Sequence, residues 1–286
     1  MNTKFSDTIL SKYSNNIKLE PDGIYYSSKV ENISYPHIGN NLCFDIEEQS
    51  FWFKHRNNCI VEMVNNFQPI ANSPIFDVGG GNGFVAQGLI NAGYNVVLVE
   101  PGLTGAKNAK KRGLQNVVCA TTNSAKFKQK SLPAIGIFDV IEHIREDYHF
   151  LKHLGDLLCS GGMLYLTVPS FQILWSHEDV EAGHFRRYTL KQVENKLLRS
   201  GFEICYSTYI FKYLPIAVGL YRSLPFRLGF RRKSDKASQE FRDDHIVKNG
   251  LFSKILDEQL RLELGQIIKK NKHRFGSSCM IAAKKR

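Results

Sequence analysis

The chain has 286 residues, of which 43% are hydrophobic, and a formal net charge of +11; this is enough for one sizeable core with additions or for two small domains. No apolar run approaches the roughly 18 residues of a membrane-spanning helix, so we expect none. Six scattered cysteines without a C-x-x-C pair argue against a zinc site or a disulfide scaffold and favour reduced thiols.

The first residues, MNTKFSDTILSKYSNN, contain no apolar stretch of the signal-peptide type, so we expect a cytoplasmic protein. We expect residues 1–72 to form an N-terminal extension. Its segment EEQSFWFKHRNNCIVEMVNNF is predicted to be helical from about Glu47.

From residue 74 onward, short apolar runs alternate with helical patterns. The predicted strands are PIFDVG, NVVLVE, NVVCAT, AIGIFDVIEH and MLYLTVPS. The predicted helices between them are FVAQGLINAG, TGAKNAKKRG and EDYHFLKHLGDLLCSGG, each closed by glycine. Near-continuous apolar strands are typical of a sheet covered by helices on both faces, so we predict a doubly wound α/β domain with a mainly parallel sheet.

Three more elements follow this alternation. TLKQVENKLLRSGF is predicted to be a helix with Thr189 as its N-cap, and residues 202–211 and 277–285 are predicted strands. Residues 212–276 lie between those strands and include the helical pattern LFSKILDEQLRLELGQIIKK. Because a structureless loop of this length is uncommon in a compact domain, we expect a helical insertion there.

The first predicted strand leads into a glycine-rich loop, DVGGGNG. The dinucleotide fingerprint G-x-G-x-x-G fails here because Phe84 occupies its third glycine position. The pattern that fits is D-x-G-x-G-x-G, formed by Asp77, Gly79, Gly81 and Gly83. An acid directly before the loop suits a positively charged ligand better than a pyrophosphate. Glycines at such a turn can also serve packing alone.

A second acid, Glu100, ends the next predicted strand. Its carboxylate is placed to accept both hydroxyls of a ribose, since ligands bind beyond the carboxyl ends of the strands in an open α/β sheet. Asp77 and Glu100 around one loop therefore indicate a nucleoside that carries a cationic or amino group. S-adenosylmethionine is such a molecule.

Residues 73–170 resemble a class I S-adenosylmethionine-dependent methyltransferase in the order of the DVGGGNG loop, Glu100, FDVIEHI and GGMLYLTVPS. The resemblance implies a Rossmann-like, seven-stranded, mainly parallel sheet that ends in an antiparallel hairpin of strands six and seven. It implies S-adenosyl-L-methionine as methyl donor and S-adenosyl-L-homocysteine as product. It also places residues 120–122 near the adenine, although CATTN lacks the acid that many members have there.

The resemblance also sets the expected domains and the donor site. The domains are an extension or lid (1–72), a donor-binding core (73–211), a helical insertion that is a substrate cap or an interfacial surface (212–276), and the final core strand (277–286). The candidate donor-binding residues are Asp77, Gly79, Gly80, Gly81, Gly83, Glu100, Pro101, Asp139 and Arg56.

The segment DVIEHI brings Asp139, Glu142 and His143 into one short turn. These groups could orient a substrate, act as a general base or bind a divalent ion. The segment is similar to the E-x-x-E-H of ubiquinone-pathway O-methyltransferases, where the positions are associated with a metal. The alternative is that Glu142 and His143 stabilise the turn and the pocket wall. We predict no metal and keep the three residues as the candidate site if one is used.

The loop HEDVEAGHFRRYT holds a second candidate base, His184. Its arginines, Arg186 and Arg187, could hold an anionic group, or they could pair with the loop's own acids and fix it. Similar segments occur in methyltransferases associated with surface-glycan and lipid-linked pathways. The candidate catalytic residues are therefore His143, His184 and Glu142.

SFWFKHRN is similar to the N-terminal helix that covers the donor in ubiquinone-type enzymes. There an arginine approaches the methionine carboxylate, and Arg56 is the matching residue. Trp52 and Phe53 could form an aromatic box for the sulfonium, or they could simply pack the extension onto the core.

Residues 226–286 hold 16 Lys/Arg and 7 Asp/Glu, so +9 of the net charge lies in this region. Upstream, the aromatic and apolar stretch 211–230 runs into RRK at 231–233. Residues 211–233 suit a peripheral contact with an anionic membrane at the inner face, whereas core packing and a dimer surface are the plainer alternatives.

The sequence thus predicts a methyltransferase acting on a small-molecule or lipid-linked acceptor, such as a hydroxyl of a sugar or of an aromatic or prenylated metabolite. The first alternative is a nucleic-acid methyltransferase that uses the basic C-terminal region, although no N/D-P-P-Y/F segment or RNA-binding motif supports it. The second is a non-catalytic regulator that binds the donor. Oligomeric state is left open.

Overall fold

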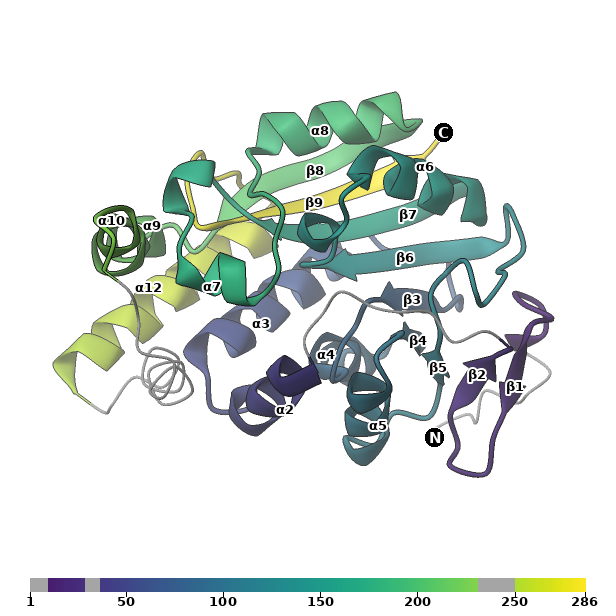
Figure 1. Cartoon of the computed structure of the whole chain (residues 1–286). Helices are drawn as coiled ribbons and strands as arrows, with labels where there is room; N and C mark the ends of the chain where they lie inside the picture. The colour runs from purple at the N-terminus through teal and green to yellow at the C-terminus, as the bar shows by residue number, and fades with distance from the viewer. Residues whose placement is uncertain (1–9, 29–36, 231–249) are drawn as a thin grey trace.

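The computed structural model describes residues 10–28, 37–230 and 250–286 (Figure 1). Its strands are β1 (Ile17–Leu19), β2 (Tyr25–Ser27), β3 (Ile75–Val78), β4 (Val96–Val99), β5 (Val117–Cys119), β6 (Leu132–Phe138), β7 (Leu158–Pro169), β8 (Phe202–Ile210) and β9 (Ser278–Lys285). Its α-helices are α2 (His37–Ile46), α3 (Phe51–Asn66), α4 (Phe84–Asn91), α5 (Leu103–Lys111), α6 (Asp147–Leu157), α7 (His177–Glu181), α8 (Leu190–Arg199), α9 (Leu214–Val218), α10 (Leu224–Arg227) and α12 (Leu251–Ile268). Short 3₁₀ segments, η1 (Ile141–His143) and η2 (Gln172–Leu174), and a π-helical turn, η3 (Gly219–Ser223), complete the described elements.

One sheet organises the molecule, with the strand order β1-β2-β5-β4-β3-β6-β7-β9-β8. Strands β5, β4, β3, β6 and β7 are parallel, and β9 runs antiparallel between β7 and β8. The predicted doubly wound, mainly parallel sheet with a terminal hairpin is confirmed. Its order reverses beside β3, where ligands bind in open α/β sheets.

The sheet has nine strands where seven were expected, because the N-terminal extension adds β1 and β2. Tyr25 of β2 pairs in parallel with Val118 of β5, and β1 forms a hairpin with β2. The local signal is Pro21-Asp22-Gly23, a turn sequence, with the Gly23 amide donating to the Glu20 carbonyl at 2.9 Å. Pairing with β5, about 90 residues away, has no such local signal.

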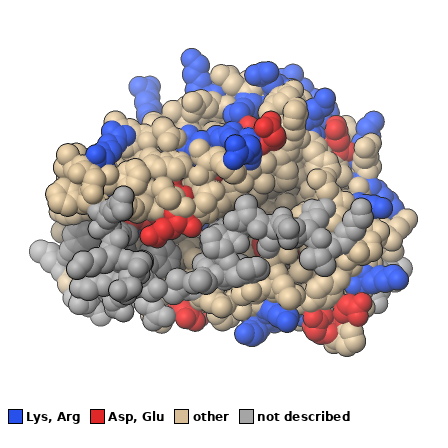
Figure 2. All heavy atoms as spheres, viewed as in Figure 1, with Lys and Arg blue, Asp and Glu red and all other residues tan. Residues whose placement is uncertain are grey.

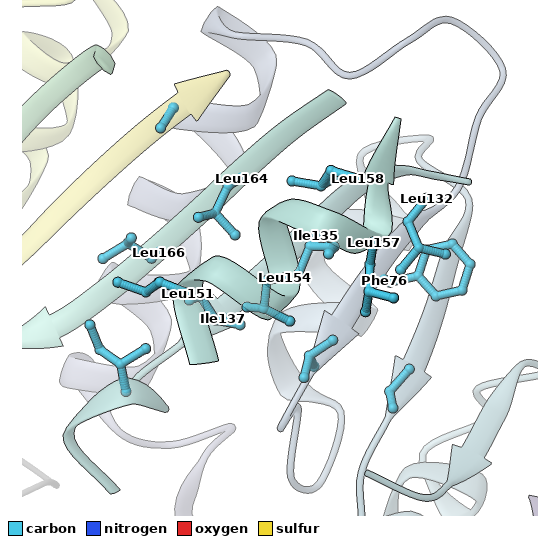
Figure 3. Packing of buried hydrophobic residues seen from close by; sticks show 14 of the residues in the cluster. Phe76, Leu132, Ile135, Ile137, Leu151, Leu154, Leu157, Leu158, Leu164 and Leu166 are labelled. Atoms are coloured by element: carbon cyan, nitrogen blue, oxygen red, sulfur yellow. The ribbon is translucent and has the colours of Figure 1, made fainter. Parts of the chain in front are cut away.

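Two apolar layers enclose the sheet. On one face, α6 and α8 cover β3, β6 and β7; Figure 3 shows Leu151, Leu154 and Leu157 of α6 against Ile135 and Ile137 of β6. On the other face, α3, α4, α5 and α12 pack against the alternate side chains of the same strands. Burial on both faces explains why the core strands are near-continuous apolar runs.

Two predicted boundaries are wrong. Helix α3 begins at Phe51 instead of about Glu47, because the Ser50 hydroxyl accepts from the Phe53 amide at 3.3 Å and caps the helix there. After α6, the pair Gly161-Gly162 does not stop a helix: α6 ends at Leu157, and β7 already starts at Leu158. A register shift opposite Leu132–Ala134 accommodates the glycines within that strand. The Thr189 cap of α8 is confirmed, since its hydroxyl accepts from the Gln192 amide.

The described part of the segment between β8 and β9 contains the helical elements α9, η3, α10 and α12, and residues 269–277 lead from α12 into β9 as turns and irregular backbone. Helix α12 packs on α3, and the Asn66 side chain donates to the Ile267 carbonyl at 2.9 Å. Residues 231–233 of the predicted membrane contact lie outside the described residues. Among the helices of the described ranges, none has the length and apolar character needed to cross a membrane.

Candidate functional site: a glycine loop, two buried acids and a histidine pair

The glycine loop joins β3 to α4 and brings its backbone against the sheet. A Cβ on Gly80 would lie 2.2 Å from Leu98 Cδ1 and 2.6 Å from Asp77 Oδ2, closer than any side chain can approach. Gly81 has a φ of +52°, in the left-handed region that favours glycine. The loop therefore takes a shape in which backbone N–H groups, not side chains, face the carboxyl ends of the strands. Predicted Gly79 and Gly83 lie in the same loop.

Glu100, directly after β4, is hydrogen-bonded to this loop. Its carboxylate accepts from the Gly81 amide at 2.9 Å and from the Gly102 amide at 2.6 Å, across Pro101. Burial raises the pKa of Glu100 to about 6, and the two amides act in the opposite direction. A carboxylate held by backbone donors keeps free lone pairs, so it can accept further hydrogen bonds from hydroxyls.

Asp77 lies on β3, where it pairs with Leu98 of β4, two residues before Glu100, and it is fully buried. Neither of its carboxylate oxygens has a hydrogen-bond partner among the residues that the structure describes. Burial raises the pKa of Asp77 to about 7; nearby Arg56 lowers it, and Glu100 raises it further. A buried carboxylate without donors is costly unless a ligand supplies them, so this acid fits a ligand with an ammonium or sulfonium charge.

Arg56 reaches the same edge of the sheet from α3. Its Nε lies 2.8 Å from Asp139 Oδ2, so the two form an ion pair, although the N–H angle is not that of a hydrogen bond. Its Nη2 donates weakly to the Thr167 hydroxyl at 3.4 Å. Thr167 in turn donates to Asp139 Oδ1 at 2.9 Å. Asp139 has a φ of +57°, so the chain turns sharply as β6 ends. Arg56 and Asp139 thus lie together beside the loop.

The aromatic residues near Arg56 are packing residues first. Trp52 stacks on Phe211 with ring centroids 5.5 Å apart, and Phe53 makes edge contacts with Trp52 and Phe84. The Arg56 guanidinium lies 5.3 Å from the Trp52 ring centroid. These contacts hold α3 on the core and leave the aromatic-box hypothesis a prediction.

Beyond Asp139, the turn η1 joins Glu142 and His143 to His184 from the following loop. The His143 and His184 rings meet edge to face at 4.7 Å, and one ligand-type atom from each of the three residues lies within 4.8 Å of the others. Asp139, included in the predicted metal trio, pairs with Arg56 instead. The structure therefore brings together the three candidate catalytic residues from two separate segments.

The environments of these three groups differ. Glu142 is fully buried, and its oxygens have no hydrogen-bond partner in the described part of the chain; burial, reinforced by Asp139, raises its pKa well above the usual range. Burial lowers the pKa of His143 to about 4, and nearby His184 adds to this lowering. Burial therefore favours the uncharged forms of both groups, the acid form of Glu142 and the neutral ring of His143.

His184 is oriented by Asp179, one of the acids of its own loop segment. His184 Nδ1 lies 2.8 Å from Asp179 Oδ1, and Asp179 also accepts from Arg187 Nε at 2.8 Å. Burial alone would raise the pKa of Asp179, but the hydrogen bonds from His184 and Arg187 outweigh it and lower the pKa. This arrangement assigns the proton to Nδ1 and leaves Nε2 as the acceptor.

The arginines of this loop are engaged within the protein. Arg187 binds Asp179, and Arg186 donates to Asp147 at 3.0 Å, where the Tyr188 hydroxyl also donates at 2.7 Å. These pairs support the reading in which the arginines fix the loop. Glu178 accepts from Ser176 and lies 3.4 Å from Arg222 of η3.

Sequence reasoning missed the residues that tie the loop to the extension. The Asn82 side chain donates to Glu47 at 3.3 Å and accepts from Asn108 at 3.0 Å, while Arg112 pairs with Glu47 at 2.5 Å. Asn82 is the one polar residue within the glycine run, which was the available signal. The predicted adenine stretch follows β5, where the Thr122 hydroxyl lies 3.2 Å from His153 Nε2.

Fold and site together define a class I S-adenosylmethionine-dependent methyltransferase, as the sequence predicts. A family model described as a methyltransferase domain matches residues 53–207, more than half of the chain, so the chain belongs to this family.

Relatives agree with this assignment. A ubiquinone biosynthesis O-methyltransferase from Colwellia psychrerythraea is 25% identical over 113 residues, 37% of this chain. The match spans 46% of that relative, about half its length. The fold is similar to phosphoethanolamine N-methyltransferase 2 of Haemonchus contortus in complex with S-adenosyl-L-methionine, with a TM-score of 0.54, 17% identity, and 91% of this chain and 61% of that one covered. It is also similar to a possible histamine N-methyltransferase from Thermotoga maritima, with a TM-score of 0.55, 16% identity, and 87% and 99% covered.

Proposed function

We propose that this protein transfers a methyl group from S-adenosylmethionine to a hydroxyl oxygen of a small-molecule or lipid-linked acceptor. The observation that carries the donor assignment is the pair of buried carboxylates at neighbouring strand ends. Glu100 is fixed by two loop amides, and Asp77 is buried without a partner among the described residues. This pair suits ribose hydroxyls beside a cationic group and suits a phosphate poorly.

In this proposal, the predicted donor residues act together. Glu100, with Pro101 and the Gly79–Gly83 loop, binds the ribose and the amino-acid part, and Asp77 balances the positive charge. Arg56, held by Asp139, supplies a cation for a carboxylate. The donor provides a methyl group on a sulfonium centre, and the chain's main task is to align it with the acceptor and to exclude water.

A hydroxyl acceptor must lose a proton during transfer, and His184 is the better placed base. Its Nδ1 is bound to Asp179, so Nε2 can take the proton while the carboxylate stabilises the resulting imidazolium. His143, whose pKa is about 4, would orient the acceptor as a neutral ring, and Glu142, whose acid form is favoured by burial, would lie beside it. The sequence relative is an O-methyltransferase by its name, which supports an oxygen acceptor.

Isothermal titration of the full chain with S-adenosylmethionine and S-adenosylhomocysteine tests the donor site. We expect saturable binding, and we expect Glu100→Ala to weaken it at least about tenfold, because two loop amides and the ribose lose their acceptor. Glu203→Ala, an exposed acid on β8, is the matched control and should bind as the wild type does. A folded protein that binds neither ligand would refute the proposal.

Turnover separates the enzyme from a donor-binding regulator. Formation of S-adenosylhomocysteine is measured with sugar, phenolic and polyprenyl-linked hydroxyl acceptors. Turnover with any of them, strongly lowered in His184→Gln while donor binding persists, supports the enzyme. Donor binding without turnover on this panel, combined with binding of bulk RNA that weakens with salt, would favour the nucleic-acid alternative.

A further inference from the structure

The helical stretch after β8 presents an apolar face to solvent. Its large side chains at positions 213, 216, 220, 221, 224 and 228 recur at helical spacing, and Tyr221 is 79% exposed and Ile216 67% exposed. Phe230, just after α10, is 67% exposed. The exposure removes core packing as the explanation for this face, because these side chains would be buried if they filled the core.

The charge of this stretch has one sign. From residue 204 to residue 234 the sequence contains no Asp or Glu, but it contains six Lys or Arg: Lys212, Arg222, Arg227, Arg231, Arg232 and Lys233. In Figure 2 the left end of the molecule, where Figure 1 places α9 and α10, shows mostly uncharged atoms, with basic side chains above them and acidic side chains below and to the right. Apolar side chains interleaved with cations are typical of helices that lie in a membrane interface.

A second copy of the chain fits this face less well. A symmetric dimer interface brings the same patch against itself, so the cations of one protomer would face those of the other without an acid from this stretch to pair with. A surface of anionic phospholipids offers the opposite charge together with an apolar layer.

The same helices contact the loop that carries the candidate base. Arg222 Nε lies 3.4 Å from Glu178 of α7, and the Arg227 guanidinium donates to the Ile173 carbonyl at 3.0 Å. His177 contacts the Phe226 ring, with centroids 4.7 Å apart. The face and the His184 loop thus form one contiguous unit at this end of the molecule.

We propose that the segment from Lys212 to Phe230 seats on an anionic lipid bilayer and that the site takes its acceptor from the plane of that membrane. The second half of this statement rests on the proposed methyltransferase function; the lipid contact itself does not. Tyr221, Leu220 and Leu228 would enter the interface, and Lys212 and Arg227 would meet the lipid headgroups.

Co-sedimentation of the full-length protein with vesicles, without methyl donor, tests the contact. We expect binding to phosphatidylcholine vesicles that contain about a third phosphatidylglycerol, and much weaker binding to phosphatidylcholine alone. Tyr221→Ser combined with Leu228→Ser should abolish pelleting. Lys212→Gln with Arg227→Gln should weaken it on the order of 30-fold, since each interfacial cation contributes about fivefold.

The matched controls lie at the opposite edge of the sheet. Leu19→Ser and Lys18→Gln remove an exposed apolar side chain and an exposed cation from β1 and should leave pelleting unchanged. Titration of each variant with S-adenosylmethionine shows that it is folded, and it separates a failure of the lipid contact from a failure of the donor site.

Three results would overturn the proposal. The first is no binding to anionic vesicles by a protein that binds S-adenosylmethionine. The second is equal pelleting of the Tyr221→Ser/Leu228→Ser variant and the Leu19→Ser variant. The third is a dimer in sedimentation analysis that Tyr221→Ser dissociates while vesicles bind neither form, since this would assign the face to a second copy.

Discussion

Glu263 of α12 provides the most direct test of how the insertion is joined to the core. Its buried carboxylate accepts from His55 Nε2 at 2.7 Å, from the Phe211 amide at 2.8 Å and from the Lys212 amide at 2.7 Å. It thereby fastens three segments: α3, the end of β8 and the insertion helix. We predict that Glu263→Ala strongly destabilises the fold.

The size of the effect follows from the donors left behind. Each buried donor without an acceptor costs about 1–3 kcal/mol, and partial rearrangement or entry of water recovers some of this, so we expect a loss of roughly 3–5 kcal/mol. That is a large share of the usual 5–15 kcal/mol of a folded domain. Glu263→Gln keeps one acceptor oxygen and places an amide against a donor, so its loss should be smaller, about 1–3 kcal/mol.

Urea unfolding of the three proteins measures this order through the midpoint at constant m. The pH dependence is a second readout. Burial alone would raise the pKa of Glu263, but the hydrogen bonds from His55 and the two amides lower it. A lowered native pKa contributes stability above the unfolded value of about 4.3 that is lost as pH falls through the native pKa, so the gap between Glu263→Gln and the wild type should narrow in acid.

The same network also holds Arg56, a residue of the proposed donor site, because His55 directly precedes it on α3. Glu263→Ala should therefore weaken S-adenosylmethionine binding as well as the fold. A loss of stability below about 1 kcal/mol for Glu263→Ala would contradict the reasoning, because it would mean that the three donors find other acceptors without cost.

Four further outcomes are expected. S-adenosylmethionine affinity should rise from about pH 6 to about pH 8, because Asp77, with a pKa of about 7, must lose its proton to pair with a cation. Asp77→Asn should flatten this rise in calorimetric titrations, and a flat wild-type profile would count against the assignment. Gly80→Ala should lose about 1–3 kcal/mol in thermal unfolding and abolish donor binding, whereas Gly265→Ala, with nothing within 4 Å of its added Cβ, should do neither. His184→Gln should lower turnover on the order of 10²–10⁴-fold with unchanged donor affinity, and unchanged turnover would exclude it as the base. Treatment with a chelator should leave both activity and stability unaltered, because His55 and Glu263 are 2.7 Å apart, a hydrogen-bond distance shorter than the ~3.3 Å between ligands around a tetrahedral zinc. A drop in stability would instead indicate a metal at His55, Cys59 and Glu263, and a drop in activity alone would indicate one at Glu142, His143 and His184.

The core of the fold could be predicted from the sequence because its signals are local. Alternating apolar runs and helical patterns define β3 to β8, and the Thr189 cap requires only Gln192, three residues away. Strands β1 and β2 escaped prediction because they have three residues each and depend on pairing with β5. Short edge strands of this kind are decided by tertiary contacts, not by their own pattern.

The candidate site divides in the same way. Asp77, the glycines and Glu100 lie within 24 residues, and their positions relative to two strands are enough to predict that they meet. The pairing of His184 with Asp179 is also short in sequence, but its approach to His143 requires the loop to fold back over η1, which the Phe185 amide secures by donating to the Glu142 carbonyl at 2.8 Å. The spacing of these residues does not predict that backbone hydrogen bond.

The donor and acceptor parts of the proposed site come from different elements of the fold. In the proposed function, strand ends and a short loop of the sheet bind the donor, whereas η1, the His184 loop and the insertion, which Arg222 and Glu178 join, bind the acceptor. A sheet with this loop can serve any acceptor that brings its nucleophile to the same point, so the loop and the insertion must select it. If the insertion face seats on lipid, access to the acceptor and recognition of the membrane would be coupled through that one contact, and Arg222→Gln should lower turnover on a vesicle-borne acceptor more than on the same acceptor in solution.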